Sequence, residues 1–392
     1  MVTSLLAHAF PVDDSLVLFE ERTGNLSLLN PTAAVMWAAY DEGLDAHSTA
    51  EKLSEVYGVP VDLALRDVRA AERQWLDARL LTDALLGPCP GPPESPPQEQ
   101  EWTRAKPPAS EFEAASQRTY LVLGSRFRVR CQNAALDRRV HPILAHLESA
   151  EEADAEHTLE AYLDGDQYVV ACDGLEVQRD SKLDMVKSRV LAEIIVRSYP
   201  EHELRAVLHA AAVCNGESCV ALPGVPGAGK STLTAALTLG GLECLTDDCV
   251  PLCGPEYLAL PFPVALSLKQ GSWEVLGARY PDLSRLPTHA LDEQRVRYLP
   301  PERPQPCGMA QGMPVRCVVY PLFCESAPTA VAPLPPADSL RRLFEARSWL
   351  KPPFSRQSVG EFVDWVRRMP AYELLYSDLD EGTEAVTGLL AA

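Results

Sequence analysis

The order of apolar and polar positions is clearest over the first 86 residues. Leu16–Phe19 and Asn25–Leu29 are short apolar runs typical of strands, and the turn residues between them predict a hairpin. The pair Asn30-Pro31 then predicts a capped helix start, because asparagine accepts backbone N–H bonds there and proline has no N–H to leave unpaired. This helix is expected to end near Tyr40.

Two further helices are predicted in the same segment. Ser48–Glu51 has the pattern of a capping box, which predicts the start of a helix that Gly58 ends. A third helix is expected over Val61–Leu80, where the apolar residues near one face are Leu65, Val68, Trp75 and Leu76. Strands followed by three short helices predict a small winged helix-turn-helix domain over residues 1–86.

A proline-rich segment follows this domain. Gly87–Pro108 contains eight prolines, with Glu and Gln between them. Such a composition cannot bury enough apolar surface to offset the entropy lost on ordering, so it predicts a linker over residues 87–110. Residues 111–392 form the expected second domain. Its outlying strands and helices are expected at Tyr120–Leu123, Phe127–Arg130, Tyr168–Val170, Leu183–Ser198, Ser358–Met369 and Gly382–Leu390.

The second domain contains a complete Walker A loop at Gly224–Ser231. The apolar run Cys219–Leu222 before it predicts a strand, and Thr232–Leu239 after it predicts a helix, which is the setting the motif requires. Backbone N–H groups of the loop and the helix N-terminus would face phosphate oxygens, and the Ser231 hydroxyl would bind Mg²⁺. The residues expected to bind the nucleotide are Gly224, Gly227, Ala228, Gly229, Lys230, Ser231 and Thr232.

An acidic pair, Asp247-Asp248, follows the apolar run Leu242–Leu245. Because ligands of open α/β sheets bind at the carboxyl ends of strands, we expect adjacent strands to bring this pair beside the γ-phosphate. One carboxylate would hold Mg²⁺ and the other would accept the proton of an attacking hydroxyl. The alternative is a surface turn. His209, fifteen residues before Gly224 on an apolar strand, is by its chemistry alone a core residue.

Charge and composition exclude several classes of function. The net charge is −20, which argues against a non-specific nucleic-acid or membrane-surface protein. Residues 1–86 carry six basic and fourteen acidic side chains, so their winged helix is not expected to bind DNA. The chain has no apolar run of 18 residues and no signal-peptide pattern, and its eleven cysteines are scattered. We therefore expect a cytoplasmic protein with reduced thiols and without a zinc site.

Three arginines of the small domain form a possible peptide site. Arg66, Arg69 and Arg73 fall on one helical face, although acidic neighbours could make this an ordinary solvated surface. The other interpretation is a basic strip beside the strand that carries Leu26 and Leu28. Together they would form a groove in which an extended acidic peptide adds as a further strand.

The small domain resembles a known family. The phrase Leu18–Ala33, a helical Trp37 and the end Arg79–Leu81 are similar to the PqqD family over residues 10–83. PqqD domains recognise the leader segments of ribosomally made, modified peptides. The resemblance therefore implies leader-peptide binding by this domain.

The second domain resembles the HPr kinase/phosphorylase family over His209–Val250. The resemblance rests on a histidine, a glycine-rich Walker loop and an Asp-Asp pair at matching spacing. It implies an α/β P-loop kinase domain of the HPr kinase C-terminal type, with ATP and Mg²⁺ as cofactors. The implied roles are phosphate binding by Gly227, Gly229 and Lys230, Mg²⁺ binding by Ser231 and Asp248, and proton acceptance by Asp247 with support from His209.

The sequence departs from the HPr kinases after the acidic pair. The C-terminal signature for the HPr protein is not visible, and Pro261–Ser272 with Arg297–Pro300 is similar to a divergent branch found with peptide-modification systems. That branch includes kinases of lasso-peptide precursors, so HPr is not the expected substrate. Cations that could neutralise the transferred phosphoryl group are Lys269, Arg297 and Arg316, although the alternative for each is a surface or structural cation.

These interpretations combine into one expected function: phosphorylation of a Ser or Thr hydroxyl of a precursor peptide whose leader binds the small domain. Three alternatives stay open. The chain could be a nucleotide-driven chaperone or switch, a small-molecule kinase or carboxykinase relative, or a transcription regulator, which the charge of the small domain disfavours. The HPr kinases tend to form hexamers, so a homo-oligomer is possible.

Overall fold

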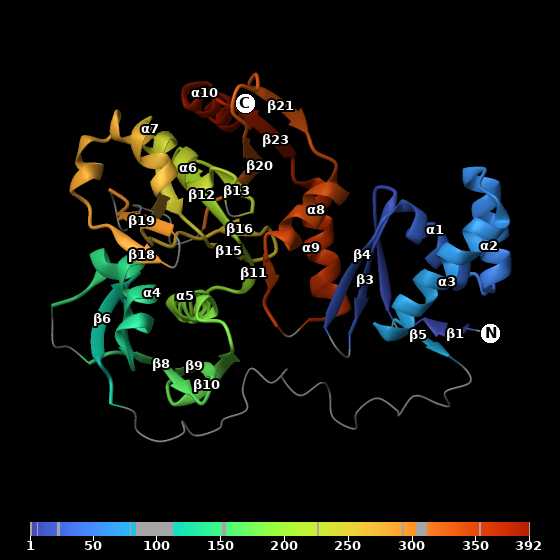
Figure 1. Cartoon of the computed structure of the whole chain (residues 1–392), viewed down its shortest axis with the longest axis horizontal. Coiled ribbons are helices and arrows are strands. Elements are labelled where there is room, and N and C mark those ends of the chain that lie inside the picture. Colours follow the sequence, from blue (N-terminus) through green and yellow to red (C-terminus); the bar gives the residue numbers. More distant parts are fainter. Residues whose placement is uncertain are drawn as a thin grey trace. The chain divides into compact units, whose positions relative to one another are not determined.

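The computed structural model of this 392-residue chain contains two compact units (Figure 1). The first comprises residues 1–100, 335–341 and 352–368, and the second comprises the rest. The expected division at residues 87–110 did not include the two C-terminal segments of the first unit, and the proposed linker itself lies outside the described residues. The structure describes residues 2–5, 7–21, 24–78, 80–83, 113–150, 154–225, 227–291, 294–302, 312–352 and 354–391.

The first unit contains a three-stranded antiparallel sheet of order β2-β3-β4, a separate pair of strands, and helices. The sequence predicted β3, β4 and the three helices that follow them, but not β1, β2 or β5. The division between the units falls within α8 (Pro336–Glu345). The other elements of this unit are β1 (Val2–Leu5), β2 (His8–Val12), β3 (Ser15–Glu20), β4 (Asn25–Leu29), α1 (Pro31–Asp41), α2 (Ala46–Tyr57), α3 (Val61–Asp77), β5 (Leu81–Asp83) and α9 (Arg356–Arg368).

Local capping explains where these helices begin and end. Asn30 caps α1 as predicted, since its side chain accepts the N–H of Ala33 at 2.9 Å. The predicted capping box of α2 is wrong. The helix begins at Ala46, because the side chain of Asp45 already accepts the N–H of Ser48 at 2.9 Å. Gly58 ends α2 in the left-handed conformation, as predicted.

The sheet of the first unit is covered on both faces. On one face, Leu18 and Leu29 join the helices in a core where the rings of Trp37 and Trp75 meet edge to face, 5.2 Å apart. The opposite face carries Phe10 of β2, directly across from Val17 of β3.

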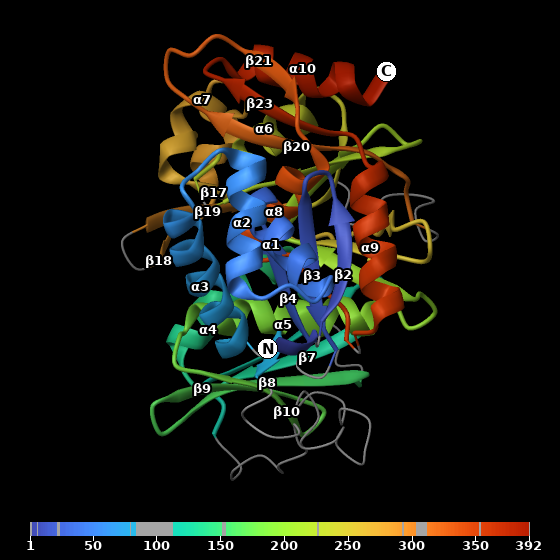
Figure 2. The ribbon, with the colours of Figure 1, turned by 90° about the vertical axis from the view of Figure 1, so that its right-hand side faces the viewer.

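Helix α9 lies beside β2 on that opposite face (Figure 2). A Cβ atom at Gly360 would lie only 3.0 Å from the Phe10 ring, so glycine permits the close approach. The backbone N–H of Ala337 also donates to Asp13 at 2.9 Å. The first unit therefore combines the N-terminal residues with residues 335–341 and 352–368.

The described part of the second unit contains four sheets. Among the described helices of the whole chain, none is long and apolar enough to cross a membrane. The elements of this unit are β6 (Ser116–Val122), β7 (Ser125–Cys131), α4 (Ala134–Leu144), η2 (Ala145–Leu147), β8 (His157–Asp164), β9 (Gln167–Cys172), β10 (Leu175–Asp180), α5 (Asp184–Ser198), β11 (Leu204–Leu208), β12 (Ala210–Cys214), β13 (Cys219–Pro223), α6 (Lys230–Leu239), β14 (Glu243–Thr246), β15 (Val250–Cys253), β16 (Leu258–Ala259), β17 (Leu266–Lys269), η3 (Gln270–Ser272), α7 (Trp273–Gly277), η4 (Pro281–Arg285), β18 (His289–Leu291), β19 (Gln294–Leu299), β20 (Val315–Phe323), β21 (Ala330–Pro333), β22 (Trp349–Leu350), β23 (Ala371–Tyr376) and α10 (Leu379–Ala391).

The central sheet has the order β14-β12-β13-β20-β23-β21. The strands β13, β20 and β23 are parallel neighbours, whereas β12 runs antiparallel between β13 and β14. The expectation that β14 adjoins the strand of the Walker loop is therefore wrong. Because β14 and β13 are each antiparallel to β12, they still run in the same direction, and their carboxyl ends lie at one edge of the sheet.

The helices α6 and α10 cover one face of the central sheet (Figure 1). Their apolar side chains pack with Val220 and Leu222 of β13 and with Leu374 of β23. A second layer, the sheet β10-β9-β8-β7-β6 with α4 and α5, forms another core around Phe127 and Ile194. The mixed α/β architecture places the Walker loop at the end of a buried strand.

Candidate functional site

The Walker loop connects β13 to α6. Gly227 and Gly229 have φ values of +95° and +92°, a region that only glycine adopts readily, and this conformation turns the loop toward the start of the helix. The first helical hydrogen bond runs from Leu233 N to Gly229 O, so the N–H groups of Lys230 to Thr232 precede it. Such N–H groups, together with the helix dipole, form a site suited to phosphate.

The Lys230 side chain is buried in the loop. Its Nζ donates to the carbonyl oxygen of Gly224 at 2.5 Å. Burial lowers the pKa of Lys230, while the charges of Asp248 and Asp247 oppose that shift. The ammonium group thus contacts the loop and interacts with the acidic pair, and it could contact a phosphate bound by the loop.

Asp247 follows β14, and two groups hold its carboxylate. The hydroxyl of Ser231 lies 3.2 Å from Asp247 Oδ1 and 3.1 Å from Oδ2, and the N–H of Ser267 donates to Oδ2 at 2.9 Å. Burial, followed by the neighbouring charge of Asp248, raises the pKa of Asp247. The serine of the Walker loop is therefore in contact with the first member of the acidic pair, not with the second.

Asp248 has a different environment. Its Oδ2 accepts from Nζ of Lys187 at 2.9 Å. Although burial opposes ionisation, the positive charge of Lys187, then that of His209, holds the pKa of Asp248 below its usual range. Its φ of +67° is rare for a residue with a side chain and indicates a backbone held in place by its surroundings. The two carboxyl groups thus differ in their hydrogen-bond partners and in the direction of their pKa shifts, and only Asp248 has a positive φ.

Lys187 is a site residue that sequence reasoning missed. It lies on α5, 61 positions before Asp248, and no local motif marks it. The pKa of Lys187 is raised, chiefly by the Asp248 carboxylate. A lysine three positions after the first residue of a helix is expected to be exposed to solvent, and only the fold shows that α5 brings it to the acidic pair.

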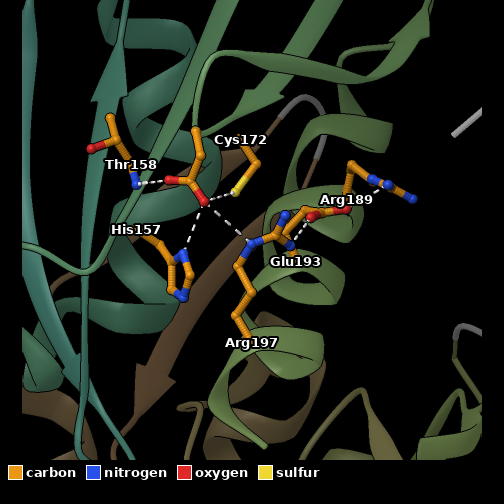
Figure 3. Close-up of polar contacts among 7 residues, drawn as sticks. His157, Thr158, Cys172, Arg189, Glu193 and Arg197 are labelled. Carbon is orange, nitrogen blue, oxygen red and sulfur yellow. Dashed lines mark hydrogen bonds and ion pairs between the residues drawn. The ribbon is translucent and has the colours of Figure 1, made fainter. Parts of the chain in front are cut away.

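A polar network holds the side of α5 that faces away from Lys187, and Figure 3 shows its members. Asp173, at the turn between β9 and β10, accepts from the Thr158 N–H at 2.8 Å and contacts the His157 ring at 2.9 Å. Arg197 of α5 lies 3.7 Å from the same carboxylate. Glu193 bridges Arg189 and Arg197 along the helix.

Arg189, Glu193 and Arg197 recur every four residues and so share one side of α5, whereas Lys187 lies two positions before this series. We conclude that the network orients α5 and thereby directs Lys187 to Asp248.

His209 lies at the junction of β11 and β12, not within a strand as expected. Its backbone N–H donates to Ser348 Oγ at 3.1 Å. Burial lowers the pKa of His209, and the charge of Asp248 opposes that shift. His209 and Asp248 therefore interact electrostatically, each shifting the pKa of the other.

The three candidate cations lie in different places. Lys269 ends β17, and its charge contributes to the lowered pKa of Lys230. Arg297 stacks 4.0 Å above the Trp273 ring and pairs across from Leu268, on the face of the hairpin opposite that of Ser267. Arg316 is exposed at the start of β20, beside the start of β13. The structure brings Lys269 to the site but not Arg297 or Arg316.

The candidate peptide site lies on the first unit. The strand β4 forms one edge of its sheet, and within the described residues it pairs only with β3. Leu26 and Leu28 pair across from Phe19 and Val17, so their side chains lie on the face away from the three helices. The backbone edge of β4, not these two leucines, is therefore what a peptide strand would meet first.

The three arginines of α3 remain available. Arg66, Arg69 and Arg73 are exposed, and none has an ion pair within the described part of the chain. The acidic residues near these arginines in the sequence form no ion pairs with them within the described residues.

A match to a protein family identifies the domain that carries this edge. A family model described as "Coenzyme PQQ synthesis protein D (PqqD)" matches residues 15–81, from the first residue of β3 to the first of β5. A solved structure described as "TbiB1 in Complex with the TbiA(beta) Leader Peptide" shares 25% identity, with 21% of this chain and 94% of that chain covered and a TM-score of 0.20. A search of the curated proteins found no match. Residues 15–81 are therefore a PqqD domain, carried in one chain with a mixed α/β unit that contains a Walker A loop.

Proposed function

We propose that this protein transfers the γ-phosphoryl group of ATP to a Ser or Thr hydroxyl of a ribosomally made precursor peptide. The observation that carries the proposal is the meeting of three features at one sheet edge. They are the Walker loop, the contact between Ser231 and Asp247, and the ion pair of Lys187 with Asp248. A loop that binds phosphates beside two carboxylates in unlike surroundings suits phosphoryl transfer to an alcohol.

Ser231 and Asp247 fit a Mg²⁺ ion. Both offer oxygen atoms, the ligand type that Mg²⁺ prefers, and the hydroxyl lies within 3.2 Å of both carboxylate oxygens. When bound, the ion would neutralise charge on the phosphate oxygens. This geometry supports Asp247 as the metal-side carboxylate, whereas the sequence resemblance had implied Asp248.

Asp248 is the better partner for the acceptor hydroxyl. Its side chain is 18% exposed, whereas Asp247 is fully buried, so Asp248 is the more accessible of the two carboxylates to a peptide hydroxyl. Lys187 and His209 keep Asp248 ionised and therefore able to accept a hydrogen bond. Because phosphoryl transfer depends mainly on positioning and charge stabilisation, a fixed carboxylate serves even with a low pKa.

Lys230 supplies positive charge to the phosphates. In the structure its Nζ bonds to Gly224 O, the interaction that a phosphate oxygen would replace. Its burial strengthens the interaction with an anion, because little water screens it. Lys269 adds a second, exposed cation on the same side.

The PqqD domain would supply the peptide. A leader strand added along β4, with acidic side chains near the exposed arginines of α3, would tether the acceptor residue to the same chain. Tethering raises the effective concentration of the acceptor at the second unit, up to the millimolar range for a short flexible connection.

Two substitutions in the full chain test the roles. Asp248→Asn should lower the rate of peptide phosphorylation about 10²-fold or more while the affinity for Mg²⁺ with nucleotide stays near that of the wild type. Asp247→Asn should instead weaken Mg²⁺ binding, measured by calorimetry, about tenfold or more.

Asp282→Asn, which changes an exposed carboxylate elsewhere in the second unit, is the matched control. The reverse pattern would return the metal to Asp248. If neither substitution at the acidic pair changed phosphate transfer, the proposal would fail.

A further inference from the structure

An exposed aromatic ring lies beside the Walker loop. Phe323 ends β20 and is 53% exposed, the largest value for any Phe, Trp or Tyr among the described residues; the next is Tyr57 at 44%. A Cβ atom at Gly229 would lie 3.6 Å from the Phe323 Cβ. A single exposed apolar side chain is common on protein surfaces, but its position next to a loop suited to phosphate makes this ring a candidate ligand contact.

The ring is held on the helix-covered side of the sheet. Phe323 pairs directly across from Tyr376 of β23, and their rings meet edge to face 5.7 Å apart. Tyr376 itself lies between two glycines. A Cβ atom added at Gly229 would lie 2.5 Å from the Tyr376 hydroxyl, and one added at Gly382 would lie 2.9 Å from the Tyr376 ring. Tyr376 therefore acts as a fixed wall between the Walker loop and α10, and Phe323 rests against it.

The loops that follow β20 and β23 are joined by hydrogen bonds. Cys324 N donates to Tyr376 O at 2.9 Å, and Ser377 Oγ donates to Ala327 O at 2.7 Å. The hydroxyl of Tyr376 has no protein partner in the described part of the chain. The carboxyl ends of β20 and β23 thus present an ordered aromatic surface with a free hydroxyl.

The sheet order fixes the direction in which a nucleotide must extend. The phosphates would lie between the Walker loop after β13 and the acidic pair after β14. On the other side of β13 come β20 and β23, which are parallel to it, so their carboxyl ends reach the same edge. A nucleotide held by its phosphates can extend its sugar and base toward Phe323 without crossing the acidic pair.

We infer that Phe323 is the platform on which the base of the nucleotide stacks, with Tyr376 as the wall beside it. The inference rests on the proposed nucleotide site and adds the subsite that distinguishes a nucleoside triphosphate from inorganic triphosphate. Every base has an aromatic face, so this platform favours nucleotides as a class and does not by itself select one base.

The test compares two ligands on the full chain by calorimetry in the presence of Mg²⁺. Phe323→Ala should weaken ATP binding about tenfold, and leave the affinity for inorganic triphosphate within about twofold of the wild type. Phe323→Trp should restore ATP binding. Leu322→Ala is the matched control, because Leu322 is also exposed but points to the opposite face of the sheet.

Each other outcome overturns the inference in a distinguishable way. Equal loss of ATP and triphosphate affinity in Phe323→Ala would show a role in loop structure instead. Unchanged ATP affinity with weaker binding of the precursor peptide would assign the ring to the acceptor. A wild-type chain that binds neither ATP nor triphosphate would refute the nucleotide site itself, and the platform with it.

Discussion

Gly227 and Gly229 allow a matched test of how the Walker loop is built. Both have nearly the same positive φ, +95° and +92°. A Cβ atom at Gly227 would meet nothing within 4 Å, whereas one at Gly229 would lie 2.5 Å from the Tyr376 hydroxyl. Alanine at either position pays the same backbone strain, but only Gly229→Ala must also displace a ring.

The magnitudes follow from these contacts. A left-handed conformation costs an L-residue about 1–2 kcal/mol, so Gly227→Ala should destabilise the loop by about that amount. Gly229→Ala adds a contact that must lengthen by about 1 Å, and overpacking of this kind costs about 1–3 kcal/mol more. The free energy of local opening of α6, measured by hydrogen exchange of its amides, should fall by the corresponding amounts.

Removing the obstructing atom completes the cycle. In the double variant Gly229→Ala/Tyr376→Phe, the 2.5 Å contact no longer exists, so the extra cost at Gly229 should shrink toward that of Gly227→Ala. Equal destabilisation by the two single substitutions would refute the close packing of Tyr376 on the loop. So would a double variant no more stable than Gly229→Ala.

Three further predictions concern other parts of the chain. Lys187→Met should lower the rate of peptide phosphorylation at least tenfold without weakening Mg²⁺ binding, because Asp248 loses the ion pair that positions it; steady-state kinetics and calorimetry measure the two effects. Burial alone would raise the pKa of Asp173, but the Thr158 N–H and His157 hold it below the usual value. Asp173 therefore stabilises the fold above the unfolded-state pKa, about 4, and this contribution is lost as the pH falls through the lowered value. Asp173→Asn should flatten this acid dependence of the unfolding midpoint. Reversing the charge of the α3 arginines should weaken binding of an acidic leader peptide about tenfold or more and reduce its salt dependence, measured by fluorescence anisotropy with Arg66→Glu, Arg69→Glu and Arg73→Glu combined.

Each of these predictions has a control and a contradicting result. Lys182→Met alters an exposed lysine just before α5 and should leave the rate unchanged; the same loss there would remove the special role of Lys187. An unaltered acid profile in Asp173→Asn would mean that other carboxyl groups govern stability. Lys52→Glu, on α2, should leave leader affinity intact, and an equal loss would show a general charge effect.

The local elements of the fold were predictable because their causes are local. Asn30 and Gly58 fix the ends of their helices through contacts within four residues, and the sequence alone reveals them. The Walker loop is similar, since its strand, glycines and helix are consecutive. The predicted start of α2 was wrong, because Asp45 caps the helix three residues before the apparent capping box.

The parts that could not be predicted depend on long-range contacts. No pattern indicates that β12 lies between β13 and β14, or that Lys187 reaches Asp248 from 61 residues away. The packing of Gly360 against Phe10 joins segments about 350 positions apart in the chain. Deleting residues 1–86 to test their role would therefore expose the apolar face of α9, and substitution is the cleaner experiment.

The measurement that most directly tests the account is the intact mass of a precursor peptide after incubation with the full chain, ATP and Mg²⁺. A suitable peptide is one encoded beside this protein. The account predicts the gain of one phosphate on a Ser or Thr residue, and loss of that gain when the leader segment is removed. Consumption of ATP with the peptide mass unchanged would contradict it and favour a nucleotide-driven switch.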